Sequence, residues 1–155
     1  MINNKKGFTL VELLVVIAII GLLSTLAVVA LNNARQKSRD ARRVADIKQV
    51  QTALEMYYND QNGYPTPPAA GVCSTGSALG EIEGCCLDDT GFVAVCGAGV
   101  KYMNLVPSNP PPNGETYIIT QVDSSTYSID YTLEGITGGI PAADHQATPA
   151  GIANP

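Results

Sequence analysis

The chain opens with a short polar segment and then stays apolar for 24 residues, from Phe8 to Leu31. Glu12 is the one charged residue inside this run. A helix needs about 20 apolar residues to cross a bilayer, so the run is long enough to span a membrane. A carboxylate inside such a span costs on the order of 2.5–3.5 kcal/mol at the helix centre, which indicates a functional role for Glu12.

After the apolar run, apolar positions recur every three or four residues, the spacing of an amphipathic helix. No proline occurs before Pro65. Because proline is the usual helix breaker, one continuous helix is expected from about Phe8 to about Asn59, with Gly63 and Pro65 ending it. The stripe that should cover a core consists of Ala41, Val44, Ile47, Val50 or Gln51, Leu54, Tyr57 and Tyr58.

The C-terminal part predicts a small β-rich head. Residues 65–115 are rich in Pro, Gly, Ser and Cys, which indicates loops. Residues 116–122 are typical of a strand, and residues 126–133 alternate strictly between apolar and polar side chains. Together they predict an antiparallel hairpin at about 116–133, whose apolar face packs against the helix stripe. From Gly135 onward, a Gly/Ala/Pro-rich segment is expected to be a loose tail.

Charge divides sharply along the chain. Residues 1–48 hold eight basic and three acidic side chains, a net of +5, and residues 49–155 hold one basic and eleven acidic, a net of −10. These add to the −5 of the whole chain. An acidic head repels phosphate backbones, so no nucleic-acid binding is expected. The basic block after Leu31 has three interpretations: contact with anionic lipid, pairing with carboxylates of a neighbour, or simply the solvated part of the helix.

Four cysteines lie in the C-terminal half, at Cys73, Cys85, Cys86 and Cys96. In an exported domain, disulfides are their expected use. A bond between the adjacent Cys85 and Cys86 is disfavoured by ring strain, which leaves Cys73 bonded to one of the pair and Cys96 to the other. Zinc binding is the weaker alternative, because the chain has no C-x₂-C pair.

The sequence offers no arrangement typical of catalysis. The single histidine, His145, falls in the expected tail, where nothing orients it as a base. No phosphate-binding glycine loop, HExxH motif or EF-hand loop occurs. Asp88, Asp89, Asp123 and Asp130 could hold calcium, but we interpret them as solvated surface carboxylates. We therefore predict no enzymatic activity, no metal and no cofactor.

The order Lys-Lys-Gly-Phe at residues 5–8, followed by Glu12 and the apolar run, resembles the class III signal of type IV prepilins and type II secretion pseudopilins. The resemblance is close over about residues 1–65. It implies peptidase cleavage after Gly7 and N-methylation of the new N-terminal Phe8. It also implies that Glu12, at the fifth mature position, pairs with the N-terminal amine of a neighbouring subunit during assembly. An ordinary secretory signal has a shorter apolar core, and a plain anchor explains neither the glutamate nor the order of the junction.

The fold that this resemblance implies is α+β and lollipop-shaped, with one long N-terminal helix packed on a small antiparallel β-sheet head. The divisions of the chain are then a leader at 1–7, a transmembrane and filament-core half of the helix at 8–31, an amphipathic half at 32–64, and the head at 65–155.

The function implied is structural. The chain is expected to be a subunit of an extracellular type IV pilus-like filament, inserted first in the inner membrane as a single-pass prepilin with its N-terminus inside. Expected partners are further copies of the chain, a prepilin peptidase and methylase, a membrane platform protein, an assembly ATPase and membrane lipid. Two alternatives stay open: the major pseudopilin of a type II secretion system, and a membrane-tethered monomeric binding module with an acidic head. Lys and Arg number six after the span and two before it, which on the positive-inside rule favours the opposite orientation. The leader motif takes precedence, because it specifies a junction read by an enzyme whereas the charge rule is a tendency.

Overall fold

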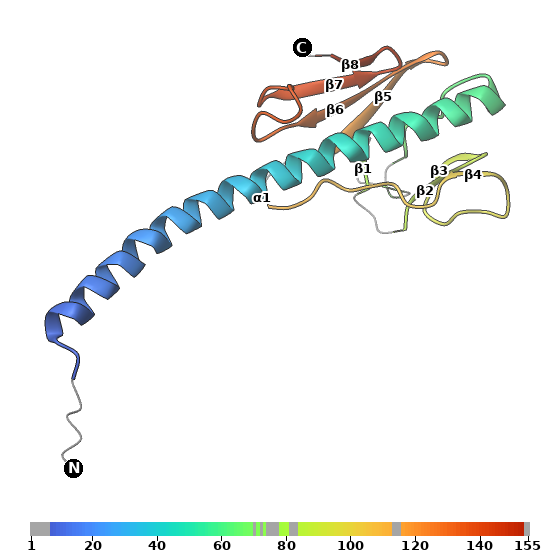
Figure 1. Cartoon of the computed structure of the whole chain (residues 1–155). Coiled ribbons are helices and arrows are strands. Elements are labelled where there is room, and N and C mark those ends of the chain that lie inside the picture. Colours follow the sequence, from blue (N-terminus) through green and yellow to red (C-terminus); the bar gives the residue numbers. More distant parts are fainter. Residues whose placement is uncertain are drawn as a thin grey trace. The chain divides into compact units, whose positions relative to one another are not determined.

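A computed structural model of the chain describes residues 7–69, 71, 73, 78–80, 84–112 and 116–153. It divides into two compact units, Met1–Gln36 and Lys37–Pro155, and α1 (Leu10–Gln61) contributes residues to both. The two predicted leader lysines, Lys5 and Lys6, lie outside the described residues. The predicted α+β class is confirmed, since the described part combines one long helix with antiparallel strands in two sheets (Figure 1).

In the N-terminal unit, α1 begins at Leu10, two residues later than predicted, because Thr9 caps it. The backbone N–H and the hydroxyl of Thr9 both donate to Glu12 Oε2 at 2.7 Å. The N–H of Glu12 donates in return to Thr9 Oγ1 at 3.2 Å. This reciprocal pair is a capping box, which satisfies two of the donors that a helix start leaves open.

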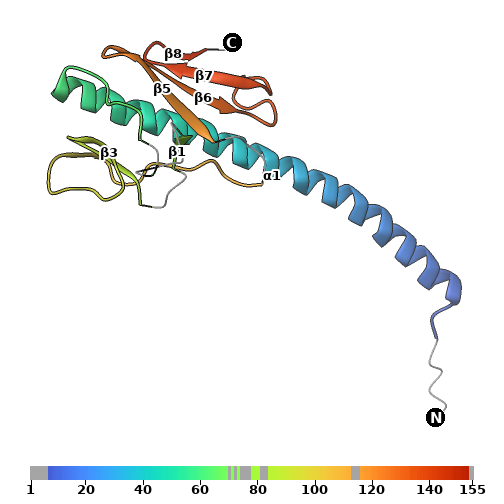
Figure 2. The same ribbon diagram turned by 180° about the vertical axis from the view of Figure 1, so that it is seen from behind.

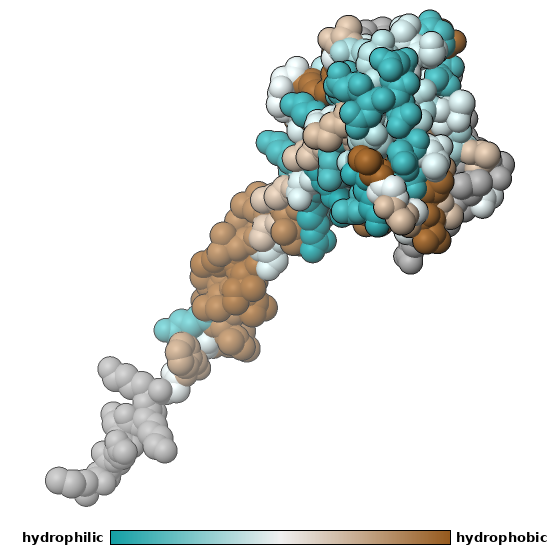
Figure 3. Space-filling view, turned by 90° about the vertical axis from the view of Figure 1, so that its right-hand side faces the viewer, coloured by the Kyte–Doolittle hydropathy of each residue, from teal (hydrophilic) through white to brown (hydrophobic). Residues whose placement is uncertain are grey.

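The side chains of the N-terminal unit have almost no cover from the rest of the chain. Residues 7–35 are all exposed. Figure 3 shows the apolar side chains of this part as a brown surface on the helix. Contiguous apolar surfaces of this size mark membrane or protein contacts in soluble and membrane proteins alike.

The helix ends at Gln61 by a left-handed residue. Asn62 has a φ of 57° and donates its N–H to the Tyr58 carbonyl at 2.8 Å. Asparagine is one of the few residue types that adopts this conformation readily, and a left-handed residue just past a helix satisfies its last carbonyls. The helix therefore ends two residues before Gly63, the glycine that the sequence pattern predicted at its end.

Two antiparallel sheets complete the C-terminal unit, a five-stranded sheet in the order β1-β5-β6-β7-β8 and a three-stranded sheet in the order β3-β2-β4. In Figures 1 and 2, β6, β7 and β8 lie on one side of the C-terminal part of α1 and the three-stranded sheet lies on the other. The strands are β1 (Ala78–Leu79), β2 (Cys86–Asp88), β3 (Gly91–Val93), β4 (Lys101–Met103), β5 (Tyr117–Asp123), β6 (Thr126–Thr132), β7 (Asp144–Thr148) and β8 (Gly151–Ala153).

The core forms where the helix stripe meets the hairpin of β5 and β6. These strands pair antiparallel with Ile119 opposite Ile129. Ile47 and Leu54 of α1 are fully buried and belong to the same apolar cluster as both isoleucines. One predicted stripe position is wrong: Ala41 is exposed. Asp40 and Arg43 are buried at that level of the helix instead.

The expected loose tail is also wrong. β7 and β8 extend the hairpin sheet, with Tyr131 opposite His145 and Ala147 opposite Ile152. His145 is 2% exposed, and Ala147 is fully buried. The sequence did not predict these strands because short strands rich in small and polar residues show little apolar periodicity. Pairing of β7 with β6 stabilises the strand conformation that local propensity alone does not favour.

Removing a core side chain from the helix stripe should destabilise the C-terminal unit. Leu54→Ala should lower the free energy of unfolding by about 2–5 kcal/mol, because it deletes a fully buried side chain. Met56→Ala, two residues away but 53% exposed, should change it by less than about 0.5 kcal/mol. Urea unfolding of the purified chain in detergent, followed by tyrosine fluorescence, measures both. Equal effects of the two variants would contradict the described packing.

Candidate functional site

The predicted cleavage junction lies in an accessible segment before α1. Gly7 and Phe8 precede the helix, and Phe8 is 90% exposed. A Cβ built at Gly7 would meet no atom within 4 Å, and the residue does not have a left-handed φ. Nothing in the described part of the chain therefore requires glycine at this position.

Glu12 has a structural role that the sequence interpretation missed. Its carboxylate is the acceptor of the capping box with Thr9. The spacing T-x-x-E at residues 9–12 was the available signal. A glutamine can serve the same cap, because the box needs an acceptor rather than a charge. The cap therefore explains a polar side chain at position 12 but leaves the negative charge without an explanation.

The other polar side chains of the apolar run bond within the helix. Ser24 Oγ donates to the Ile20 carbonyl at 2.7 Å, and Thr25 Oγ1 donates to the Leu22 carbonyl at 2.8 Å. A hydroxyl without a partner is costly in an apolar medium. By length and composition, α1 is long and apolar enough to cross a membrane, with its apolar stretch near the N-terminus.

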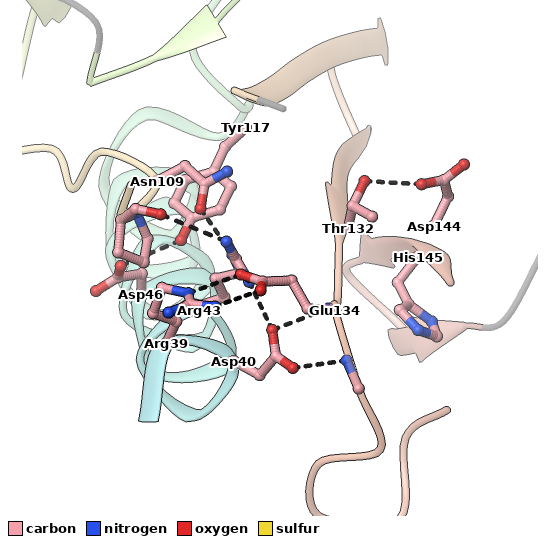
Figure 4. A network of polar contacts seen from close by, with 12 residues as sticks. Arg39, Asp40, Arg43, Asp46, Asn109, Tyr117, Thr132, Glu134, Asp144 and His145 are labelled. Carbon is pink, nitrogen blue, oxygen red and sulfur yellow. Dashed lines mark hydrogen bonds and ion pairs between the residues drawn. The ribbon is translucent and has the colours of Figure 1, made fainter. Parts of the chain in front are cut away.

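A buried ion cluster lies where the C-terminal unit begins on α1 (Figure 4). Arg39, Asp40 and Arg43 of the helix meet Glu134, which follows β6; we call these four residues the ion cluster. Arg39 binds Glu134 with two hydrogen bonds, at 2.8 and 2.5 Å. Arg43 Nη1 lies 2.6 Å from Asp40 Oδ1 and 2.7 Å from Glu134 Oε1. Asp40 and Arg43 are fully buried, so each charge depends on its partners.

The ion cluster also holds two loops on the helix. Asp40 accepts the backbone N–H groups of Glu134 and Gly135 at 3.0 and 2.8 Å. Arg43 Nε donates to Asn109 Oδ1 at 2.7 Å. Segments about 66 and 95 residues away in the sequence are thus tied to one turn of α1. The hydrogen bonds from Arg39 lower the pKa of Glu134 to about 2, with Arg43 adding to the effect.

This network corrects the interpretation of the basic block. Arg43 is fully buried and Arg39 is only partly exposed, and both form ion pairs with carboxylates of their own chain. The Asp40–Arg43 spacing of three on a helix could have indicated the local pair. Glu134 lies 94 residues from Asp40, a contact that only the fold creates. The basic side chains of the block that remain exposed are Arg35, Lys37, Arg42 and Lys48.

The four cysteines form two disulfides, Cys73–Cys85 and Cys86–Cys96. This is one of the two connectivities that the sequence left open. Cys73, Cys85 and Cys86 are fully buried. Loops of about ten residues closed by a bond stabilise a fold by roughly 3 kcal/mol in the chain-entropy account.

The aspartates considered for calcium are used elsewhere. Asp88 is 2% exposed, so its interpretation as a solvated carboxylate is wrong. It accepts hydrogen bonds from Thr90 and from the Gly97 N–H, which lower its pKa. Asp123 caps the β5–β6 turn by accepting from Ser125. Within the described residues, no three His, Cys, Asp or Glu side chains are placed to hold a metal.

Comparison with known proteins finds sequence similarity in the N-terminal part of the chain. A family model described as the prokaryotic N-terminal methylation motif matches residues 2–28. The type II secretion system core protein G of Aeromonas hydrophila is 44% identical over 64 residues, 41% of this chain and 45% of that protein. The protein of the same name from Escherichia coli is 42% identical over 64 residues, 41% of this chain and 44% of that protein.

A second kind of relative matches over a longer stretch. The fimbrial protein of Dichelobacter nodosus is 40% identical over 90 residues, 54% of this chain and 56% of that protein. The chain thus spans less than half the length of the secretion proteins that it matches, and just over half of the fimbrial protein. No solved structure matches the chain. These matches confirm the resemblance to the type IV pilin and pseudopilin superfamily, which rests on the N-terminal part of the chain.

The ion cluster predicts a pH dependence of stability. The pKa of Glu134 in the folded chain, about 2, is below its ordinary value of 4.5. Its contribution to stability is therefore complete above about pH 4.5 and is lost as the pH falls towards 2. The difference in unfolding free energy between the parent and Glu134→Gln should be largest at neutral pH and shrink through this window.

Arg39→Gln serves as the companion variant. Because Arg39 is the main cause of the lowered pKa of Glu134, its loss should move the acid transition to higher pH. Denaturant unfolding at a series of pH values measures both variants. A parent–variant difference that stays constant from pH 7 to pH 2 would contradict the role of Glu134.

Proposed function

We propose that this chain, whose N-terminal part is of the type IV pilin and pseudopilin superfamily, is a structural subunit of an extracellular pilus-like filament. The observation that carries the proposal is the combination at the N-terminus. A glycine that the fold does not need precedes an apolar helix that the fold does not cover. A carboxylate lies at the fifth position after that glycine.

The exposed apolar surface needs two successive environments. A newly made chain can hold residues 8–31 in lipid, with the leader of residues 1–7 on the cytoplasmic side of the inner membrane. In a filament, the same surfaces pack against those of other copies. Ser24 and Thr25 suit both environments, because each hydroxyl already has a backbone partner. Gly21, beside which no atom lies within 4 Å of a built Cβ, leaves room for a neighbouring helix to approach closely.

The charge of Glu12 supports assembly rather than anchoring. Cleavage after Gly7 creates a free amine on Phe8, and a buried amine without a counter-charge is costly. Opposite charges about 4 Å apart attract far more strongly in a protein interior than in water. A Glu12 carboxylate beside the amine of a neighbouring copy therefore offsets the desolvation of both groups. A single anchored chain has no such use for the charge.

The choice of a pilus over a secretion pseudopilus is supported by the length of the matches. The similarity to the fimbrial protein covers 54% of the chain, more than the leader and helix provide. The similarity to core protein G covers 41%, which is about the leader and helix alone. The major pseudopilin of a type II secretion system stays the second candidate, since core protein G supplies several of the relatives. Either role implies a prepilin peptidase, a platform protein and an assembly ATPase as partners.

Processing at the junction gives the first test. Mass spectrometry of the membrane-extracted protein should show an N-terminus at Phe8 that carries one added methyl group. Gly7→Val should abolish cleavage while leaving the two disulfides formed, because the fold has room for a side chain there. An intact Met1 in cells that contain the peptidase would refute the proposal, as would normal cleavage of the valine variant.

Glu12 allows the cap and the charge to be separated. Glu12→Gln keeps an acceptor for Thr9 and removes the charge, whereas Glu12→Ala removes both. If the charge serves assembly, both variants should lose filaments to a similar extent, because an uncompensated buried amine costs on the order of 3–5 kcal/mol. Electron micrographs and immunoblots of sheared fractions, at matched expression, measure filament yield.

One outcome would contradict a role of the Glu12 charge in assembly. If Glu12→Gln gives normal filament numbers while Glu12→Ala does not, the glutamate acts as a helix cap only. Both variants should insert in the membrane and form the two disulfides, since neither event uses the charge. A piliated host whose parent chain gives no filaments would favour the tethered binding module instead.

A further inference from the structure

The five-stranded sheet has one face that the helix does not cover. Tyr117, Ile119 and Ile129 point to the core side, so the alternate residues of these strands form what we call the outer face. Ile118, Asp130 and Gln146 lie in register across it, and the next row holds Thr132 opposite Asp144. These five residues line a recess of about 300 Å³, and Thr116, Tyr131 and His145 complete its lining.

The outer face carries negative charge with no positive charge to meet it. Asp130 accepts a hydrogen bond from the Gln146 amide at 3.0 Å, and Asp144 accepts one from the Thr132 hydroxyl at 2.7 Å. Both donors are neutral, and neither aspartate forms an ion pair within the described part of the chain. The one lysine or arginine beyond position 48, Lys101, belongs to β4 of the other sheet. The recess is thus open to a cation from outside the fold.

The complementary surface is on the same chain. Lys37, Ala41, Ala45 and Lys48 recur at spacings of three and four, so they lie along one face of α1; we call them the lysine strip. All four are exposed. Neither lysine forms an ion pair with another described residue. The alanines between them have small side chains, so another protein surface can approach the helix closely beside the lysines.

We propose that the lysine strip of one copy docks on the outer face of a second copy, with a lysine ammonium in the recess beside Asp130 and Asp144. This contact rests on the proposed filament function, because it joins the C-terminal units of two copies that the filament holds side by side. Charge complementarity identifies the occupant as a second copy. Every subunit carries both the two lysines and the two aspartates, and none of these four forms an ion pair among the described residues. Lysine suits a recess of this size, since its slender stem reaches in while its ammonium meets both carboxylates.

Charge reversal with rescue tests the contact. Asp144→Lys should lower the yield of sheared filaments about tenfold, because like charges then face each other at every repeat of the contact. Adding Lys37→Glu or Lys48→Glu should restore the yield in at least one case, since the reversed pair attracts again. Arg42→Glu is the matched control: it changes the charge equally, is 63% exposed, and lies roughly 120–140° around the helix from both lysines. It should not restore filaments.

The other outcomes separate this contact from the filament function itself. Asp144→Asn, which keeps an acceptor for Thr132, should give an intermediate yield, and all variants should retain both disulfides by thiol labelling. Normal filaments from Asp144→Lys, rescue by Arg42→Glu as good as by the lysine variants, or no rescue by either lysine variant would overturn the contact and leave the filament function standing. Absence of filaments from the parent in a piliated host would overturn both.

Discussion

An apolar segment of 24 residues, helical from Leu10 onward, is unstable in water, and this constraint governs the molecule. The C-terminal unit has its own core, which takes no side chain from residues 8–31. Cover must therefore come from lipid or from other protein surfaces, which in the proposed filament are further copies of the chain. The hydrogen bonding of the segment suits both, because its hydroxyls bond to their own helix. The charge of Glu12 is the exception, because no residue of the described part of the chain forms an ion pair with it.

In the C-terminal unit, a small, loop-rich domain is attached to a helix by three kinds of interaction. Apolar packing does this from Ile47 to Leu54, and the ion cluster does it at the preceding turns. Two disulfides fasten residues 73–96, where strands are two or three residues long. A chain exported across a membrane gains from covalent closure, because short strands alone bury little apolar surface. Removing one partner of the ion cluster should destabilise the fold for a different reason, because it leaves a buried charge without a counter-charge.

The sequence predicted what depends on local pattern. The long helix, its late end and the hairpin all follow from apolar periodicity and from the absence of proline, and the structure has each of them. What failed depends on distant partners. Asp40 and Arg43 are buried because Glu134, Gly135 and Asn109 arrive from elsewhere, and His145 is ordered because its strand pairs with β6. The junction at Gly7 is the opposite case. It was predicted from the order of residues alone, and no described contact in the fold requires a glycine there.

The central claim is that the apolar half of α1 is covered by other copies and that Glu12 meets a neighbour's N-terminus there. A cryo-electron microscopy map of filaments sheared from cells tests it most directly. The account predicts a filament core made of residues 8–31 from successive copies. It places the Glu12 carboxylate within about 4 Å of the Phe8 nitrogen of an adjacent copy, the separation of an ion pair. A map in which this segment lies outside the filament core, or in which Glu12 contacts only Thr9 of its own chain, would contradict the account.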